Sequence, residues 1–182
     1  MSRSDCFNKI VSLRTNMGHD NLEQYFSWFE LKSLPRTGWV QNGVSNPETV
    51  ASHSWGMSLL AMKLCPENLD LSKVLQICIV HDLPESIVGD ITPYDGVSKV
   101  DKKKMESEAM KNIAPEFNEL WEEYENQSSE EAKFVKRMDK LDMSVQAMIY
   151  KKQLAMDSET FIQSAKKYLE EEDLDLILKF AN

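Results

Sequence analysis

The chain has 182 residues, of which 42% are hydrophobic and 28% are charged, with only six glycines and six prolines. This composition favours one compact, helix-rich domain over residues 1–182 and excludes a largely disordered chain. The formal net charge of −9 argues against binding to a nucleic acid polymer, which requires clustered lysine and arginine. A small phosphorylated substrate is still compatible with it, because one metal ion and one arginine can hold a phosphate.

The cysteines and the N-terminus indicate the cellular compartment. Cys6, Cys65 and Cys78 are odd in number and show no CxxC spacing, so a disulfide framework and a thiolate zinc site are both disfavoured. Residues 1–13 lack the apolar segment of a signal peptide, and no run of 18 apolar residues occurs. We therefore expect a cytoplasmic protein with no membrane partner, although a nuclear location is also compatible.

The first predicted helix runs from Asn21 to Lys32, where apolar residues recur at helical spacing. Pro35, Gly38 and Gly43 then break the pattern and predict a loop over residues 35–47. This loop carries two candidate substrate-binding residues, Arg36 and Trp39.

A second helix is predicted over residues 50–64, with His53 on the same face as Val50 and Met57, so His53 should point inward. A third helix should run from Ser72, as its N-cap, to about Leu83. It would deliver the pair His81-Asp82 at its C-terminal end.

Pro84 predicts a new helical turn that ends at Gly89, followed by a loop that contains Asp90. Glu85 lies four residues after His81 and three after Asp82, so a helical continuation would place their polar groups on one side.

Polar helices are expected over residues 98–113 and from Pro115 onward. The spacing of Ser128 and Glu131 predicts the start of a long helix, in which Asp139 is stacked with Asp142 beside an apolar stripe. That stripe could serve the core or an interface. Two more helices, over about 158–168 and 173–180, should pack on a core of residues 22–150. No strand pattern appears, so the predicted fold class is all-α.

The acid and imidazole side chains on these helices suggest a divalent metal site. Each has an ordinary alternative: His53 could be a hydrogen-bonded core residue, Asp90 a turn residue, and Asp139 a partner of Arg137 or Lys140. For Lys140, a solvated helix-edge position is expected rather than a phosphate contact. The convergence of three inward-facing helices favours the metal site.

The spacing His53, His81-Asp82, Asp139 resembles that of the HD-domain phosphohydrolases. Four longer blocks are similar to the 5′-deoxynucleotidases of that superfamily; they are residues 34–40 (LPRTGWV), 47–54 (PETVASHS), 80–91 (VHDLPESIVGDI) and 120–125 (LWEEYE). The resemblance runs from about Leu22 to Tyr150.

The resemblance implies a single helical HD-domain bundle with a metal site between its core helices. His53, His81, Asp82 and Asp139 would hold a divalent cation, which would be Mn²⁺, Co²⁺ or Mg²⁺. Glu85 and Asp90 would act on water and the leaving oxygen, or help to hold a second ion.

For the substrate, the resemblance implies a deoxyribonucleoside 5′-monophosphate whose phosphate is bound by Arg36. Trp39 would exclude a 2′-hydroxyl, unless it is only an anchor in the core. The resemblance also implies a homodimer.

The chain departs from the pattern of these enzymes in two places. Ser52 stands where an acidic residue often precedes the first histidine, which predicts a looser orientation of His53. Arg36 and Trp39 are separated, whereas in bacterial relatives the pair is contiguous.

Three alternative functions compete with the 5′-deoxynucleotidase. A triphosphohydrolase or a guanosine-tetraphosphate hydrolase would need more basic residues than Arg36, and few lie near the motifs in the sequence. A non-catalytic helical scaffold is disfavoured because every expected ligand is present. A histidine-rich two-metal site is excluded because the third histidine, His19, is outside the motifs.

Overall fold

The computed structural model describes residues 22–181, and within them the backbone consists of helices and loops with one isolated antiparallel bridge, between Pro35 and Thr49. This confirms the all-α fold class. The predictions that concern Cys6 and His19 lie outside the described residues. None of the helices described is both long and apolar enough to cross a membrane.

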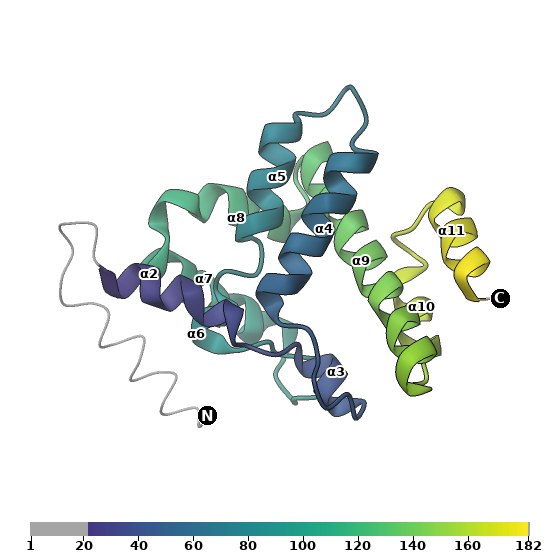
Figure 1. Cartoon of the computed structure of the whole chain (residues 1–182). Helices are drawn as coiled ribbons and strands as arrows, with labels where there is room; N and C mark the ends of the chain where they lie inside the picture. The colour runs from purple at the N-terminus through teal and green to yellow at the C-terminus, as the bar shows by residue number, and fades with distance from the viewer. Residues whose placement is uncertain (1–21, 182) are drawn as a thin grey trace.

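The elements in chain order are α2 (Leu22–Phe29), η2 (Glu30–Lys32), α3 (Thr37–Gln41), α4 (Val50–Leu64), α5 (Leu71–Val80), α6 (Glu85–Val88), α7 (Lys99–Ile113), η3 (Pro115–Phe117), α8 (Asn118–Asn126), α9 (Glu130–Leu154), α10 (Glu159–Ala165) and α11 (Glu171–Ala181) (Figure 1).

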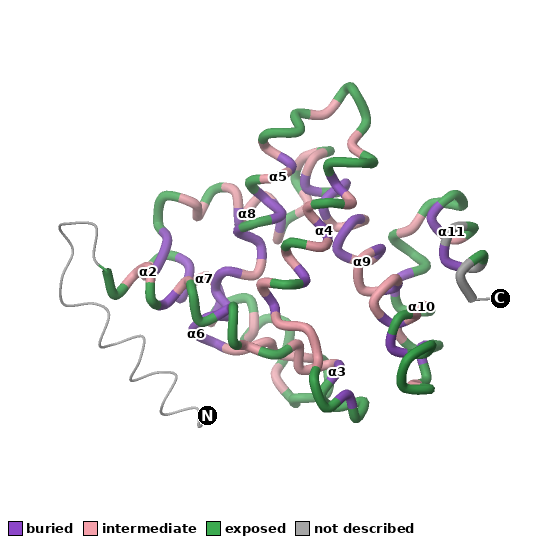
Figure 2. The backbone as a smooth tube through the Cα atoms, viewed as in Figure 1, coloured by how far each residue is buried: buried purple, intermediate pink, exposed green. Residues whose placement is uncertain are grey.

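Helices α4, α5 and α9 pack against one another at the centre of the molecule (Figure 1). Their facing sides carry fully buried apolar residues, among them Met57, Ile77 and Met138. Burial of one such side chain contributes about 1.5–3 kcal/mol to folding. In Figure 2, buried segments recur along these three helices between intermediate and exposed ones. The inward-facing polar residue His53 is buried among them.

The remaining helices pack around this centre on two sides. Helices α2, α6, α7 and α8 surround a second apolar cluster that includes Ile87, Met110 and Trp121. Helices α10 and α11 pack against α9. Arg137 on α9 links α11 to α9, because its guanidinium donates to both carboxylate oxygens of Asp173 on α11 at 2.6 and 3.1 Å. Arg137 is therefore not the partner of Asp139 that the sequence allowed.

The predicted bounds of α4, residues 50–64, are confirmed. The predicted N-cap of α5, Ser72, is wrong because α5 begins at Leu71. Asp70 caps it, accepting hydrogen bonds from the backbone N–H groups of Ser72 and Lys73 at 2.9 and 3.3 Å. Asp and Ser are almost equally good capping residues, so the sequence did not distinguish two candidates that lie two residues apart.

The predicted N-cap of α9 is wrong by one residue for the same reason. Ser129, not Ser128, accepts the hydrogen bond from the backbone N–H of Ala132 at 3.0 Å.

The segment before α4 is held against the helix by the bridge at Pro35. The backbone N–H of Arg36 donates to the carbonyl of Glu48 at 3.0 Å, and that of Val50 donates to the carbonyl of Leu34 at 2.9 Å. The loop predicted over residues 35–47 also contains a short helix, α3. This arrangement places Arg36 beside the start of α4, close to the buried histidines.

Candidate active site

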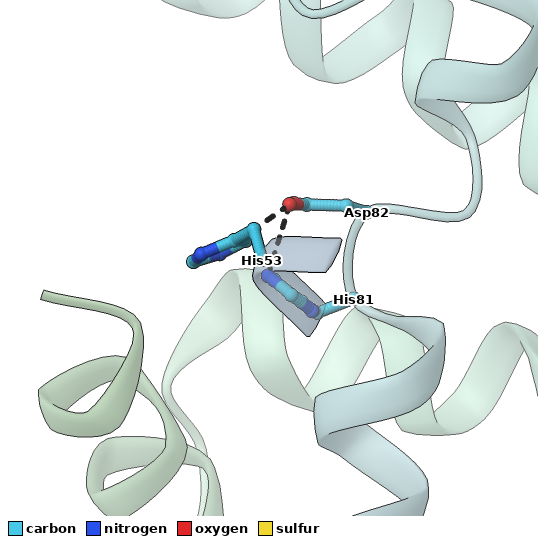
Figure 3. Close-up of side chains that lie close together, drawn as sticks. All are labelled: His53, His81 and Asp82. Carbon is cyan, nitrogen blue, oxygen red and sulfur yellow. Dashed lines mark ion pairs between the residues drawn. The ribbon is translucent and has the colours of Figure 1, made fainter. Parts of the chain in front are cut away.

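Two histidines and an aspartate converge where α4 meets the turn after α5. His53 lies on α4, while His81 and Asp82 follow the last residue of α5 (Figure 3). The Oδ2 atom of Asp82 lies 3.1 Å from His81 Nε2 and 3.8 Å from His53 Nε2. Helix α5 ends earlier than predicted, yet the pair His81-Asp82 still faces the centre of the bundle.

Asp139 joins this group from α9. Its Oδ1 atom lies 3.5 Å from His53 Nε2. Its Oδ2 atom accepts a hydrogen bond from the Tyr124 hydroxyl at 2.9 Å and contacts the ammonium groups of Lys136 and Lys140 at 3.0 and 3.1 Å. Three of the four predicted metal ligands, His53, His81 and Asp82, therefore have ligand atoms within 4.8 Å of one another, and Asp139 joins them through His53. One oxygen of Asp139 faces His53, while the other contacts the two ammonium groups.

The imidazole rings direct their Nε2 atoms toward the carboxylates. His81 Nδ1 donates to the carbonyl of Cys78 at 2.9 Å, and His53 Nδ1 lies 2.7 Å from Oδ2 of Asp142. Both Nε2 atoms are buried and have no hydrogen-bond partner among residues 22–181. A carbonyl only accepts, so the proton of a neutral His81 is on Nδ1 and its Nε2 carries a lone pair. A divalent cation would take the place of the proton on Nε2 of His53, and two imidazole nitrogens beside two carboxylates fit such a cation.

The electrostatic potential at His53 is negative. Burial and Arg36 lower the pKa of His53, but Asp139 and Asp142 outweigh them and raise it to about 9. Although burial raises the pKa of Asp139, Lys140 and Lys136 hold it well below its usual range. Asp139 is therefore ionised, and its negative charge favours positive charge beside the imidazole of His53.

Asp142 contacts His53 but was not among the site residues predicted from the sequence. Its only local signal is its position three residues after Asp139 on the same helix. Ser52, from which a looser His53 was predicted, is exposed and contacts Thr49 at 2.9 Å between hydroxyl oxygens. Asp142 on α9 supplies a carboxylate to His53 in place of an acidic residue at position 52, and the looser orientation of His53 stays a prediction.

Glu85 on α6 faces the same site from a buried position, with a residue exposure of 5%. Its Oε1 atom lies 3.8 Å from the Lys102 ammonium, and its Oε2 atom has no hydrogen-bond partner in the part of the chain described. Burial, with Asp82 and Asp90 next in importance, raises the pKa of Glu85 well above its usual range. Glu85 is thus a buried carboxylic acid that can carry a proton near neutral pH.

Asp90 follows a sharp turn at the end of α6. Gly89 has a φ of 84°, in the left-handed region that favours glycine. The turn directs Oδ2 of Asp90 to the backbone N–H of Thr37, at 2.7 Å. Asp90 therefore does more than occupy a turn, because it fixes the first residue of α3 beside Arg36.

A cavity of about 950 Å³ opens beside this cluster, and Arg36 lies at its wall. An Nη1 atom of Arg36 is 3.3 Å from Asp82 Oδ2. The predicted site residues that line the cavity are Arg36, Trp39, His81, Asp82, Glu85, Asp90 and Asp139.

Six lysines also line the cavity. They are Lys99, Lys102 and Lys103 from α7, Lys136 and Lys140 from α9, and Lys167 after α10. The expectation of few basic residues near the motifs is therefore wrong in three dimensions. Lys140 is not the solvated residue expected either, because its side chain is only 21% exposed and contacts Asp139. Lys102 was missed because it lies on a polar helix whose sequence gives no sign of which face meets the site.

Trp39 is both a core anchor and part of the cavity wall. It is 2% exposed, and its indole N–H donates to Glu48 Oε1 at 2.9 Å. Its ring packs against Phe161 of α10 and Tyr150 of α9, with centroids 4.2 and 5.3 Å away. Phe161 also lines the cavity and lies outside the motif-bearing core expected over residues 22–150.

Comparison with known proteins agrees with this arrangement. A model of the HD domain matches residues 29–176. The chain is 45% identical over 151 residues to the human protein named 5′-deoxynucleotidase HDDC2, covering 77% of this chain and 74% of the human one. It is 46% identical over 129 residues to the mouse protein of the same name, covering 66% and 65%, respectively. The crystal structure of the PH0347 protein from Pyrococcus horikoshii superposes with a TM-score of 0.78 at 36% identity, covering 88% of this chain and 98% of that one. The chain therefore belongs to the HD domain family and is a homologue of the 5′-deoxynucleotidases within it.

Proposed function

We propose that the protein is a metal-dependent 5′-deoxynucleotidase, which releases inorganic phosphate from deoxyribonucleoside 5′-monophosphates. The observation that carries this proposal is the pair of unpartnered Nε2 atoms of His53 and His81, which face two carboxylates beside a cavity that Arg36 lines. The relatives named 5′-deoxynucleotidase support the substrate class.

His53, His81, Asp82 and Asp139 are the residues that would hold the cation. Mn²⁺ and Co²⁺ suit the mixture of imidazole and carboxylate better than Mg²⁺, which prefers oxygen ligands alone. A bound cation would supply a water of lowered pKa and would polarise a phosphate oxygen. Glu85 and Asp90 are the candidates for holding a second ion.

Arg36 would bind the phosphate through its planar fork of N–H donors, which matches two phosphate oxygens. Its ion pair with Asp82, at 3.3 Å, places it beside the metal ligands. A phosphate bound to Arg36 would therefore lie next to the cation. Asp90 would keep the backbone after Arg36 in position through its hydrogen bond to Thr37.

Glu85 would transfer the proton in the hydrolysis. Water adds to phosphorus, the bond between phosphorus and the 5′ oxygen breaks, and the leaving oxygen takes a proton. A carboxyl group with a raised pKa is suited to donate that proton and to recover it from the attacking water.

The wall formed by Trp39 and Phe161 would select deoxyribose. The indole N–H of Trp39 is already bonded to Glu48, so a 2′-hydroxyl facing the rings would find no partner from it. An unpaired hydroxyl costs about 1–3 kcal/mol in protein sites, which corresponds to roughly a 10- to 100-fold preference for the deoxynucleotide.

Two further parts of the proposal concern assembly and location. The protein would act as a homodimer in the cytoplasm. The apolar stripe of α9 continues through Val145 and Met148, which are partly buried against the core, and this supports a core role for the stripe. Trp55, Leu59 and Met62 form an exposed stripe on α4 and are the surface where an interface can be tested. A change of Trp55 to Lys that left the mass measured by light scattering unaltered would exclude this surface.

The test is phosphate release from a panel of nucleotides by the reconstituted protein with Mn²⁺ or Co²⁺. Deoxynucleoside 5′-monophosphates should be hydrolysed much faster than ribonucleotides, and Asp82→Ala should lower the rate by at least about 100-fold. Deoxynucleoside triphosphates belong in the panel because the six lysines of the cavity remove the charge argument against them. Equal release by parent and variant would refute the proposal, and a parent that binds no divalent ion would support the scaffold alternative.

A further inference from the structure

A glycine lies in the middle of α4, at position 56 of the helix that runs from Val50 to Leu64. Glycine at such a position normally destabilises a helix relative to alanine, because it loses more backbone entropy on folding. Gly56 is three residues after His53, so both lie on one side of the helix. The glycine therefore needs an explanation from what faces it.

Asp142 of α9 is the group that faces Gly56. One of its oxygens, Oδ2, lies 2.7 Å from His53 Nδ1. A Cβ atom at position 56 would lie 2.5 Å from the other oxygen, Oδ1, and 3.5 Å from the carboxylate carbon. The first distance is far shorter than van der Waals contact, so alanine at position 56 is incompatible with this position of the carboxylate.

We propose that Asp142 is the positioning residue of His53, and that glycine at position 56 is required for its carboxylate to reach the imidazole. With Nδ1 donating to Asp142, the ring is fixed in the tautomer and orientation that present Nε2 to Asp82 and Asp139. The carboxylate reaches His53 across the interface between α4 and α9, which replaces the acidic neighbour absent at position 52.

The packing of the two helices determines what an added methyl group would displace. Around Gly56 and Asp142, α4 and α9 bury Met57, Met138 and Leu141 completely, so the backbones cannot separate without opening the core. The Asp142 side chain is 13% exposed and can rotate toward solvent. The methyl group should therefore expel the carboxylate and leave His53 without its hydrogen bond.

Among the described residues, Glu48 is the other carboxylate that has an oxygen within 4.8 Å of ligand atoms of both His53 and Asp142. Its Oε1 atom accepts the indole N–H of Trp39, and its backbone N–H donates to the Tyr150 hydroxyl at 2.7 Å. These bonds hold Glu48 to the Trp39 side of the site. It should not take the place of Asp142 when that carboxylate moves.

The experiment measures Mn²⁺ affinity calorimetrically in the full-length chain, without nucleotide, for Gly56→Ala, Asp142→Ala, the double variant and the parent. Each single change should weaken Mn²⁺ binding by about 10- to 100-fold, the usual effect of losing a partner of a ligating histidine. The double variant should be no weaker than Asp142→Ala, because the methyl group then has no carboxylate to displace. Ser52→Ala is the matched control on the same helix and should bind like the parent.

The thermal stability of the metal-free proteins gives a second readout. Gly56→Ala should raise the melting temperature in the Asp142→Ala background, where alanine is simply the better helix former, and should fail to raise it in the parent. Parent-like Mn²⁺ affinity in Gly56→Ala, or additive losses in the double variant, would overturn the inference.

This inference rests on the metal-binding role proposed for His53 but not on the substrate. A parent that binds Mn²⁺ yet releases no phosphate from deoxynucleotides would refute the proposed function alone. A parent that hydrolyses them while Gly56→Ala keeps full Mn²⁺ affinity would refute the positioning role alone.

Discussion

At the scale of single residues, the site depends on which atoms are already engaged. Each buried histidine has its Nδ1 bonded and its Nε2 without a partner among the residues described. The sequence predicted His53, His81, Asp82 and Asp139 because helical spacing shows which residues share an inward face. It could not predict Asp142, because the contact joins residues 89 positions apart and depends on how α4 lies against α9.

The buried acid Glu85 yields the first prediction. Glu85→Gln keeps the shape of the side chain but removes the proton that the leaving oxygen needs. The value of kcat for a deoxynucleoside 5′-monophosphate should fall by about 100- to 10,000-fold, while Mn²⁺ affinity should change little. Steady-state kinetics and calorimetry measure the two quantities. A loss of metal affinity as large as the loss of kcat would instead assign Glu85 to metal binding.

The phosphate contact of Arg36 yields the second prediction. Arg36→Lys keeps the charge but replaces a two-pronged donor by a single ammonium group. The expected loss is about 1–3 kcal/mol of binding, seen as a roughly 10- to 100-fold higher KM. The matched control is Lys99→Arg, which keeps the charge at an exposed lysine of the cavity wall. An unchanged KM for Arg36→Lys would contradict the role of Arg36.

At the scale of helices, apolar periodicity predicted where the elements lie, but local chemistry determined their ends. The bounds of α4 were predicted correctly because Thr49 is the one good capping residue just before Val50, and its hydroxyl accepts the N–H of Ser52. The starts of α5 and α9 were wrong where two capping residues compete. Helix α3 was missed because its five residues, TGWVQ, are too short to show a periodicity.

The cap of α5 yields the third prediction. Asp70→Ala removes a carboxylate that accepts two backbone N–H bonds and should lower the free energy of unfolding by about 1 kcal/mol. Ser72→Ala, at the position predicted from the sequence, should cost less than about 0.5 kcal/mol. Urea unfolding of both variants tests this, and a larger loss at Ser72 than at Asp70 would reverse the assignment of the cap.

At the scale of the whole molecule, the cavity is assembled from segments far apart in the chain. Residues of α3, α6, α7, α9 and α10 all contribute to its wall. The motifs predicted the acidic residues that line the cavity, which are Asp82, Glu85, Asp90 and Asp139. They did not predict the lysines or Phe161, because those residues belong to no motif and reach the cavity only through tertiary packing. A single domain over residues 1–182 stays a prediction.

Bringing these segments together also buries Glu106 of α7 next to the site, which yields the last prediction. Burial, followed by the neighbouring carboxylates of Glu125 and Asp82, raises the pKa of Glu106 to about 7, although Lys102 lowers it. Because the folded protein keeps a proton there that the unfolded chain releases near pH 4.5, this group stabilises the fold at low pH. That contribution is lost as the pH rises through about 7, and its full size is up to roughly 3 kcal/mol.

Glu106→Gln removes this dependence because glutamine has no proton to lose. Relative to the parent, the variant should therefore gain up to roughly 3 kcal/mol in free energy of unfolding between pH 5 and pH 8. Urea unfolding of the metal-free proteins across this range measures the difference, and the exposed Glu108→Gln on the same helix is the control for losing one charge. If the difference between variant and parent stayed constant with pH, Glu106 would have to be ionised throughout. Lys102 would then outweigh burial in setting its charge.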